Sequence, residues 1–324
     1  MLRNTDDGAH GEMAFRVGSF HRGHLCLDDR KNGNGNDNDM RLLSPAKINL
    51  FLYVTGKRPN GYHDLYTLMC PVSLYDIVEL TVKSSTIRIR CDHPEVPENE
   101  TNLAHQAAQL FFEALRKRHG NLSQGAEISI IKRIPVAAGL GGGSSNAAMV
   151  LVGLNRHFSF PFSSETLEAM GLVIGADVPF FIRGRPAIAT GVGEVLEPLK
   201  SFPAFYVLLV NPGVAVSTAE VYKNLNLGLT NNQKINKEAF FRLRDLDPAR
   251  YLWNDLERVT ASKFPEILTI KEALLANGAE GALMTGSGPT VFGLFCDAKR
   301  AQQASLVLSR HDRWRLFLAE AIRE

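Results

Sequence analysis

The segment that most constrains this chain is glycine-rich: Pro135-Val-Ala-Ala-Gly-Leu-Gly-Gly-Gly-Ser-Ser145. Its four glycines and two serines leave backbone N–H groups free to converge on one anion. The alanine-rich stretch at 144–155 predicts a helix, and the positive end of a helix dipole attracts the same anion. These features predict a phosphate-binding loop between a strand at 127–131 and that helix. The alternative is a flexible glycine turn that only caps the helix.

Three common nucleotide-binding patterns do not fit this loop. A Walker loop ends in Gly-Lys-Ser/Thr, and no lysine follows Gly143. A dinucleotide-binding fingerprint needs glycine where Ser144 stands. The His-Arg-Asp and Asp-Phe-Gly motifs of protein kinases are missing from the sequence. Any phosphate chemistry here must therefore belong to another class of enzyme.

Composition predicts an ordinary globular protein. With 324 residues, 45% hydrophobic and 22% charged, the chain can form two compact domains that share one cleft. A formal net charge of +2 gives no support for a nucleic-acid or membrane-surface partner. The four cysteines, Cys26, Cys70, Cys91 and Cys296, have neither CxxC nor zinc-like spacing, so we expect reduced thiols in a reducing compartment.

The first residues differ from the rest of the chain. Residues 1–39 end in the run Lys31-Asn-Gly-Asn-Gly-Asn-Asp-Asn-Asp39, which has no side chain able to anchor a core, so we expect a disordered extension. Its acidic residues oppose a transit peptide, and it lacks the apolar core of a secretory signal. The alternative is that Met40 is the true start. No apolar run approaches the roughly 20 residues of a membrane span, so we expect a cytoplasmic protein.

From Met40 onward, apolar segments separated by glycine, proline and asparagine predict interleaved strands and helices of an α/β fold, without internal repeats. Helices are expected at 103–119, capped by Asn102 or Thr101, and at 144–155, 163–174 and 266–277. A turn is expected at 58–61. Strands are expected at 48–55, 76–83 paired with 86–90, 127–131, 186–196, 205–210, around 283, and at 291–295.

A second segment with chemical character is Ser44-Pro-Ala-Lys-Ile-Asn-Leu50. The two-residue period of a strand places Lys47 and Asn49 on one face. A lysine on an otherwise apolar strand is unusual, and its structural alternative is an edge residue that prevents aggregation. The segment therefore marks a candidate polar site within a core strand.

Two further segments complete the set. In Gly175-Ala-Asp-Val-Pro-Phe-Phe181, partial desolvation by the neighbouring proline and aromatics suits Asp177 to accept a proton, although such a residue can equally be a turn or cap. Met284-Thr-Gly-Ser-Gly-Pro-Thr290 is a second small-residue loop that allows a backbone to approach a ligand, with a simple β-turn as the alternative.

In order and spacing, these four segments resemble the GHMP kinase superfamily. Its members carry a Pro-x-x-x-Asn-Leu segment, a Gly-Leu-Gly-Gly-Gly-Ser-Ser-type loop and a C-terminal Thr-Gly-Ser/Thr-Gly loop. The resemblance covers the chain from Met40 to its end. It implies an α/β, or α+β, two-domain GHMP kinase fold around a central cleft. The expected parts are a ribosomal-protein-S5-domain-2-like domain at 40–197 that binds ATP and a ferredoxin-like α/β domain at 198–324.

Within the superfamily, one branch is a closer match. Arg58-Pro-Asn-Gly-Tyr-His63 and Gly191-Val-Gly-Glu194 resemble the kinases that phosphorylate the 2-hydroxyl of 4-(cytidine 5'-diphospho)-2-C-methyl-D-erythritol, in the non-mevalonate route to isoprenoid precursors. The alternatives are a mevalonate- or homoserine-kinase-like enzyme and a non-catalytic nucleotide-binding relative. The resemblance implies a small-molecule acceptor, no nucleic-acid or membrane partner, and a monomer or homodimer.

The resemblance also implies residue roles on the donor side. Asp177 is expected to be the general base and Lys47 its cationic partner, with ATP and Mg²⁺ as cofactors and no metal ligands assigned. Phosphoryl transfer depends largely on positioning and charge stabilisation, which agrees with this pair. The residues expected to bind ATP are Asn102, Lys132, Pro135, Val136, Ala137, Ala138, Gly139, Leu140, Gly141, Gly142, Gly143, Ser144 and Ser145.

On the acceptor side, the resemblance implies that Tyr62 and His63 bind cytidine and that Tyr222 stacks on the base. Asn49 is expected to contact the erythritol portion, and Val192 to line it. Gly286, Ser287 and Gly288 form the additional loop. One departure is the pair Ala137-Ala138, which replaces a stretch that is often richer in glycine and reduces the freedom of that backbone.

Overall fold

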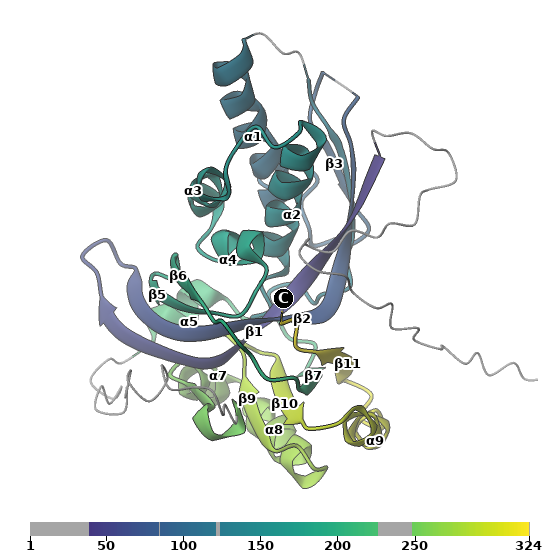
Figure 1. Cartoon of the computed structure of the whole chain (residues 1–324). Helices are drawn as coiled ribbons and strands as arrows, with labels where there is room; N and C mark the ends of the chain where they lie inside the picture. The colour runs from purple at the N-terminus through teal and green to yellow at the C-terminus, as the bar shows by residue number, and fades with distance from the viewer. Residues whose placement is uncertain (1–38, 84, 121–123, 226–247, 324) are drawn as a thin grey trace, which may run out of the picture.

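A computed structural model describes residues 39–83, 85–120, 124–225 and 248–323 (Figure 1). The extension expected at 1–39 lies outside these residues except for Asp39, which begins the first strand. Described residues form two sheets with helices packed on each. The architecture is the mixed α/β type that the sequence predicted.

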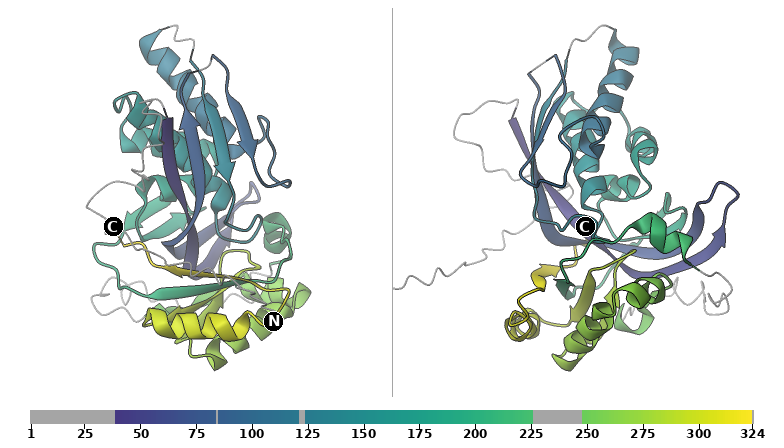
Figure 2. Two further views of the ribbon diagram at one scale, coloured as in Figure 1. Left: turned by 90° about the vertical axis from the view of Figure 1, so that its right-hand side faces the viewer. Right: turned by 180° about the vertical axis from the view of Figure 1, so that it is seen from behind.

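The larger sheet has seven strands in the order β3-β4-β2-β1-β8, with β5 and β6 continuing from β2. Its centre is a long, bent ribbon of two antiparallel strands that runs through the molecule (Figures 1 and 2). The strands are β1 (Asp39–Lys57), β2 (His63–Thr81), β3 (Arg88–Cys91), β4 (Glu127–Ile131), β5 (Ala187–Gly191), β6 (Val195–Pro198) and β8 (Trp253–Asn254).

The smaller sheet is antiparallel in the order β11-β7-β10-β9. It begins after Pro198, whereas β8 returns to the larger sheet beside β1. The division of the chain into 40–197 and 198–324 stays a prediction. The four strands are β7 (Tyr206–Asn211), β9 (Gly281–Met284), β10 (Val291–Phe295) and β11 (Arg315–Glu320).

Four helices cover one face of the larger sheet, and the remaining described helices pack on the smaller one (Figure 2). Asn102 caps the first helix through its side-chain oxygen, as predicted, and Ser163 caps the third. The helices are α1 (Leu103–His119), α2 (Gly142–His157), α3 (Ser164–Ile174), α4 (Val178–Arg183), α5 (Thr218–Lys223), α7 (Glu257–Lys263), α8 (Glu266–Ala276) and α9 (Ala298–Leu308), with a 3₁₀ turn η4 (Pro248–Tyr251).

A shared core joins the two sheets. Ile48 and Phe51 of β1 belong to the same buried cluster as Leu209 of β7 and Phe292 of β10. Burial of apolar surface stabilises a fold in proportion to the area removed from water, so this cluster fixes one sheet against the other. The cleft between them therefore has walls whose positions are set by packing.

Three local predictions need correction. The segments 76–83 and 86–90 do not pair, because β4 lies between β2 and β3 and hydrogen-bonds to both. The pattern of two adjacent strands could not reveal a third strand that arrives only after α1. Strand 186–196 is two strands, β5 and β6, joined by a turn at 192–194. Helix α2 begins at Gly142, so two of the loop glycines form its first turn.

Candidate active site

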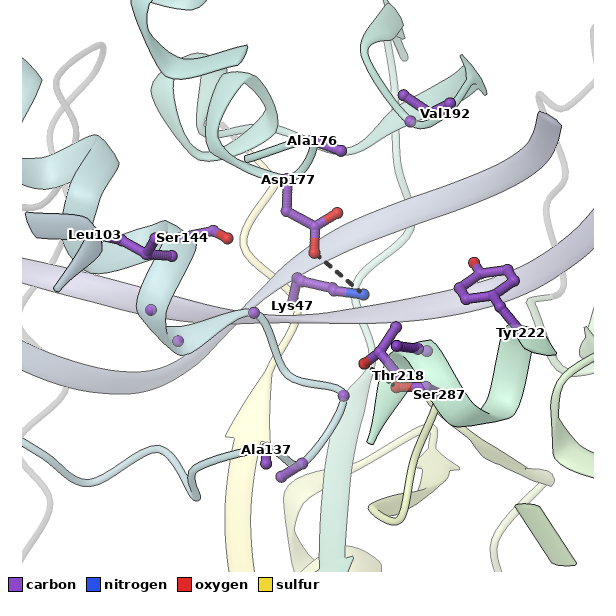
Figure 3. A pocket seen from close by; sticks show the side chains of 18 of the residues that line it. Lys47, Leu103, Ala137, Ser144, Ala176, Asp177, Val192, Thr218, Tyr222 and Ser287 are labelled. Atoms are coloured by element: carbon purple, nitrogen blue, oxygen red, sulfur yellow. Dashed lines mark hydrogen bonds and ion pairs between the residues drawn. The ribbon is translucent and has the colours of Figure 1, made fainter. Parts of the chain in front are cut away.

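A cleft of about 1140 Å³ runs across the ribbon between the two helical parts (Figure 3). Three of the predicted site residues do not line it: Leu140 and Ser145 are buried in the core, and Gly288 packs against Met284. The predicted residues that do line the cleft are Lys47, Asn49, Tyr62, His63, Asn102, Lys132, Pro135, Val136, Ala137, Ala138, Gly139, Gly141, Gly142, Gly143, Ser144, Asp177, Val192, Tyr222, Gly286 and Ser287.

The glycine loop bends sharply beside the stem of the Lys47 side chain. Gly141 has φ +72°, and a Cβ built on it would lie 2.9 Å from the Phe181 ring and 3.2 Å from Lys47 Cγ. Only glycine avoids both the steric clash and the backbone strain, since other residues rarely adopt a left-handed backbone. Gly141 is also the N-cap of α2 and has no side chain to accept from the first turn, so those N–H groups are left for an anion.

Ala137 stands in the loop where similar sequences often have glycine, and its backbone conformation shows the consequence. Its φ of +51° lies in the left-handed region that favours glycine. Holding a non-glycine residue there costs on the order of 1 kcal/mol, which the surrounding packing must offset. The adjoining Ala138 is buried in the core shared by the two sheets. The loop therefore keeps a glycine-like bend without a glycine at this position.

Beneath the loop lies a buried polar cluster that sequence reasoning missed. Asp76 is fully buried, and one of its carboxylate oxygens accepts from the backbone N–H groups of Arg133 and Ile134 at 2.8 and 2.9 Å. The other oxygen pairs with Lys132 Nζ and accepts from Asn146 Nδ2 at 3.0 Å. Buried charges persist when they are paired and hydrogen-bonded in this way. Asp76 thus anchors the strand-to-loop connection to α2.

Lys132 and Asn102 are each held by their own hydrogen bonds, Lys132 by this cluster and Asn102 by the start of α1. A Cβ on Gly142 would lie 3.0 Å from Lys132 Nζ, so the ammonium sits against the first turn of α2. The side chain of Asn102 accepts from Ala104 N at 2.9 Å and donates to the Pro97 carbonyl at 2.7 Å. Both residues reach the cleft wall, and both also hold the structure around it.

Lys47 and Asp177 meet at the centre of the cleft (Figure 3). The ammonium nitrogen and a carboxylate oxygen are 3.9 Å apart, with side-chain exposures of 6% and 35%. Burial lowers the pKa of Lys47, and the Asp177 charge partly opposes that shift. An oxygen atom between them can hydrogen-bond to both at about 2.8 Å, so the pair can hold a hydroxyl group.

The second small-residue loop closes the cleft from the smaller sheet. Asn254 holds it by donating from Nδ2 to the carbonyls of Met284 and Gly286, both at 2.8 Å. Ser287 exchanges a hydrogen bond of 2.7 Å with the Thr218 hydroxyl of α5. The second loop is therefore fixed on both sides, and Gly286 lies against Lys47.

The far end of the cleft is aromatic. The rings of His63 and Tyr222 stack with centroids 5.0 Å apart and planes 24° apart, and the Tyr62 side chain is mostly exposed beside them. Burial, with a smaller effect of the Lys57 charge, lowers the pKa of His63, so this ring is neutral near pH 7. Burial raises the pKa of Tyr222. Neutral aromatic faces of this kind suit a planar base.

The chain is similar to known proteins over most of its length. The model of the GHMP kinases N terminal domain matches residues 102–185, and that of the GHMP kinases C terminal domain matches residues 234–313. A relative from Syntrophotalea carbinolica, called 4-diphosphocytidyl-2-C-methyl-D-erythritol kinase, is 46% identical over 87% of this chain and 99% of its own. A relative of the same name from Syntrophus aciditrophicus is 44% identical over 87% and 99%. This chain belongs to the 4-diphosphocytidyl-2-C-methyl-D-erythritol kinase family.

Solved structures support the assignment to this kinase family. A crystal structure of 4-(cytidine 5'-diphospho)-2C-methyl-D-erythritol kinase superposes with a TM-score of 0.70 at 36% identity, over 87% of this chain and 99% of that one. A homoserine kinase from Cytophaga hutchinsonii superposes with a TM-score of 0.67 at 18% identity, over 88% and 95%, which shows only a common fold. As a member of the kinase family, the chain is an ATP-dependent phosphotransferase with the two-domain GHMP fold.

Several residues of this kinase site were missed from the sequence because their partners are distant along the chain. Asp76 and Lys132 are 56 positions apart, and Thr218 and Ser287 are 69 apart. No local pattern distinguishes Asp76 from the other polar residues of a strand. Lys132, by contrast, follows directly from the family resemblance.

Proposed function

We propose that this kinase transfers the γ-phosphate of ATP to the 2-hydroxyl of 4-(cytidine 5'-diphospho)-2-C-methyl-D-erythritol. The observation that carries the proposal is the Lys47–Asp177 pair, placed between a phosphate-binding loop at one end of the cleft and an aromatic pair at the other. The names of the relatives support the same acceptor. The kinase is proposed to catalyse this step of the isoprenoid precursor route in the cytoplasm. Within the described residues, no helix is long and apolar enough to cross a membrane.

The proposed reaction uses Asp177 as general base. Its carboxylate takes the proton of the acceptor hydroxyl while the hydroxyl oxygen bonds to the γ-phosphorus and the bond to the leaving ADP breaks. Lys47, held at 3.9 Å, orients the hydroxyl and stabilises the negative charge that develops on the transferred group. The first turn of α2 and the Lys132 ammonium attract the remaining phosphates.

Mg²⁺ is expected to arrive with ATP. It needs only one or two protein oxygens when phosphates and water supply the rest of its octahedron. Among the residues that the structure describes, no group of three or more His, Cys, Asp or Glu forms a metal cage. Ser144 fits the smaller requirement, since it lines the cleft in the first turn of α2. This residue would hold the ion, which neutralises phosphate charge.

For the acceptor, we propose that cytosine is bound by Tyr62, His63 and Tyr222, and that Val192 and Asn49 contact the methylerythritol portion. All five residues line the aromatic and central parts of the cleft. Recognition by stacking and hydrogen bonds to a base edge distinguishes this acceptor from mevalonate and homoserine, which carry no base. The proposal leaves the oligomeric state, monomer or homodimer, as a prediction.

The direct test is a coupled assay of ADP release. Purified protein with Mg²⁺ and ATP is expected to consume ATP with the cytidine-diphosphate methylerythritol, and not with mevalonate or homoserine. ³¹P NMR of the product should show a new phosphomonoester on the methylerythritol unit. Turnover with mevalonate instead would identify another GHMP activity, and ATP binding without turnover on any of the three would indicate a non-catalytic relative.

A further inference from the structure

The Asn49 side chain lies between Lys47 and a residue that no motif identifies, Thr67. Lys47 Nζ donates to Asn49 Oδ1 at 2.5 Å, and Asn49 Nδ2 donates to Thr67 Oγ1 at 2.8 Å. Thr67 in turn donates from its hydroxyl to the Phe51 carbonyl at 2.6 Å. All three residues in this chain of bonds, Lys47, Asn49 and Thr67, are at least 95% buried. The bonds therefore operate in a water-poor environment, where each is stronger.

Donor and acceptor capacities permit only one orientation of this amide. A lysine ammonium has donors and no acceptor, so the group that Asn49 turns toward Lys47 must be its oxygen. The Thr67 hydroxyl has a single hydrogen, which is used on the Phe51 carbonyl, so Thr67 can only accept from Asn49. A flipped amide would point N–H groups at the ammonium and leave the Thr67 oxygen facing another acceptor.

An irregularity of the ribbon creates this arrangement. The β1–β2 register shifts between Asn49 and Phe51, where Leu50 is the extra residue of a β-bulge. Bulges re-aim side chains and free backbone groups from the regular ladder, and they occur often beside active sites. Here the Phe51 carbonyl is placed where the Thr67 hydroxyl of the facing strand can reach it.

We propose that Thr67 is a positioning residue of the kinase reaction: it fixes the Asn49 amide so that its oxygen faces Lys47 and holds the ammonium protonated and in place beside Asp177. This inference rests on the proposed function, because it concerns how Lys47 is kept ready for the acceptor hydroxyl. Thr67 needs no contact with substrate to act in this way.

The other groups around Lys47 have different or weaker roles. Across the cleft, the Asp177 carboxylate faces the ammonium at 3.9 Å, and the titratable Tyr222 phenol lies close enough to Asp177 to feel its charge. From the second loop, Gly286 contributes only backbone, whereas Thr285 Oγ1 accepts from Asn49 N at 3.0 Å and donates to Asn49 Oδ1 at 3.4 Å. The Asn49 oxygen is thus the short, neutral acceptor of the Lys47 ammonium, and of the two threonines that orient its amide, Thr67 makes the shorter bond, at 2.8 Å.

The test compares Thr67→Val with Thr67→Ser. Valine has nearly the shape of threonine and no hydroxyl, whereas serine keeps the hydroxyl and loses one methyl group. In Thr67→Val we expect kcat to fall by about tenfold or more, the effect typical of leaving one buried donor, here Asn49 Nδ2, without a partner, with KM for ATP within about twofold of the parent value. The alkaline limb of kcat against pH should move to lower pH, and Thr67→Ser should restore both properties.

A readout without catalysis makes the inference independent of the acceptor. NMR titration of ¹³C-labelled lysine, with Lys47→Arg to assign the signal, should show a lower pKa for Lys47 in Thr67→Val than in the parent and in Thr67→Ser. Thermal unfolding of each variant establishes that it is folded. An unchanged Lys47 titration in folded Thr67→Val would overturn the inference, whatever its turnover. If the parent protein has no turnover with the acceptor, the proposed function fails, and the titration still decides the role of Thr67.

Discussion

Gly139 of the phosphate loop touches Thr285 of the second loop so closely that a methyl group on its Cα would lie 2.3 Å from the Thr285 carbonyl oxygen. The two loops that enclose the donor end of the cleft are therefore one interlocked unit. A side chain at Gly139 must push them apart, because the atom it meets belongs to backbone.

The first prediction follows from this contact. Gly139→Ala combines a backbone φ of +77° with the clash, and we expect it to lower the free energy of unfolding by about 2–3 kcal/mol and to weaken ATP binding by at least about tenfold. Urea denaturation and nucleotide titration measure the two effects. The matched control is Gly120→Ala, with φ +81° and, among the residues that the structure describes, no atom within 4 Å of the new Cβ. Equal effects of the two substitutions would show that strain alone, and not the loop contact, is responsible.

Removal of the proposed base should separate binding from chemistry. Asp177→Asn keeps the shape of the side chain and removes its ability to take a proton, so we expect kcat to fall by about 10²-fold or more. ATP affinity, measured by calorimetry, should stay within about twofold, because the base acts on the acceptor in the transition state. A parallel loss of ATP affinity and kcat would assign Asp177 a structural role instead.

The lowered pKa of Lys47 predicts how turnover falls at alkaline pH. The ammonium must be protonated to act, and burial lowers its pKa from the ordinary value of 10.5, so turnover should fall before that pH is reached. Between the pKa of Lys47 in the folded chain and its higher pKa in the unfolded chain, the unfolded chain binds more protons than the folded one. In this pH range Lys47 therefore makes the free energy of unfolding rise with pH. Lys47→Arg should remove this limb while lowering kcat, because the planar guanidinium stays charged but does not match the site. An unchanged limb in Lys47→Arg would assign it to another group.

Asp76 should matter for stability more than any surface acid. Asp76→Asn leaves the Lys132 ammonium buried beside a neutral amide, and we expect a loss of about 3–5 kcal/mol. The double variant Asp76→Asn/Lys132→Met should regain part of it, since no unpaired charge remains. Glu168→Gln, at the partly exposed ion pair with Arg183 (side-chain exposures of 17% and 31%), is the control and should cost clearly less, about 1 kcal/mol. Similar losses for Asp76→Asn and Glu168→Gln in urea denaturation would contradict the buried role.

Removal of the Arg58 side chain should weaken binding of the acceptor and not of ATP. Its guanidinium joins Asp64 at 2.7 Å to Glu194 at 3.8 Å, and so connects the turn before Tyr62 with the turn that carries Val192. Arg58→Ala should raise KM for the acceptor several-fold and leave KM for ATP unchanged.

The matched surface control for Arg58→Ala is Lys83→Ala, which removes a comparable exposed ion pair with Glu127 at 3.6 Å, remote from the cleft. It should leave both Michaelis constants at the parent values. A rise in KM for ATP in Arg58→Ala would mean that the disturbance is global rather than confined to the acceptor end.

Much of the fold could be predicted from the sequence, because its signals are local. Apolar spacing and Asn102 as a cap define α1, and glycine at 139 and 141 defines the phosphate loop. Pairings that skip along the chain could not be predicted, since β4 enters between β2 and β3 only after a long excursion. The same limit hid Asp76 and Thr67: their roles come from partners on other elements, and an isolated acid or threonine in a strand has no distinctive pattern.

The β1–β2 ribbon carries both ends of the site on one piece of backbone. Lys47 and Asn49 lie along its length, with Thr67 bonded to Asn49 from the facing strand, while Tyr62 and His63 stand where β2 begins. From Thr67 back to His63 the strand covers about 13 Å at its normal rise. The distance between the proposed base-binding and phosphate-transfer sites is thus set by hydrogen-bonded strands. The ribbon therefore selects the acceptor by its length. A longer or shorter acceptor would not place its hydroxyl at Lys47 and Asp177, even if it carried the same base.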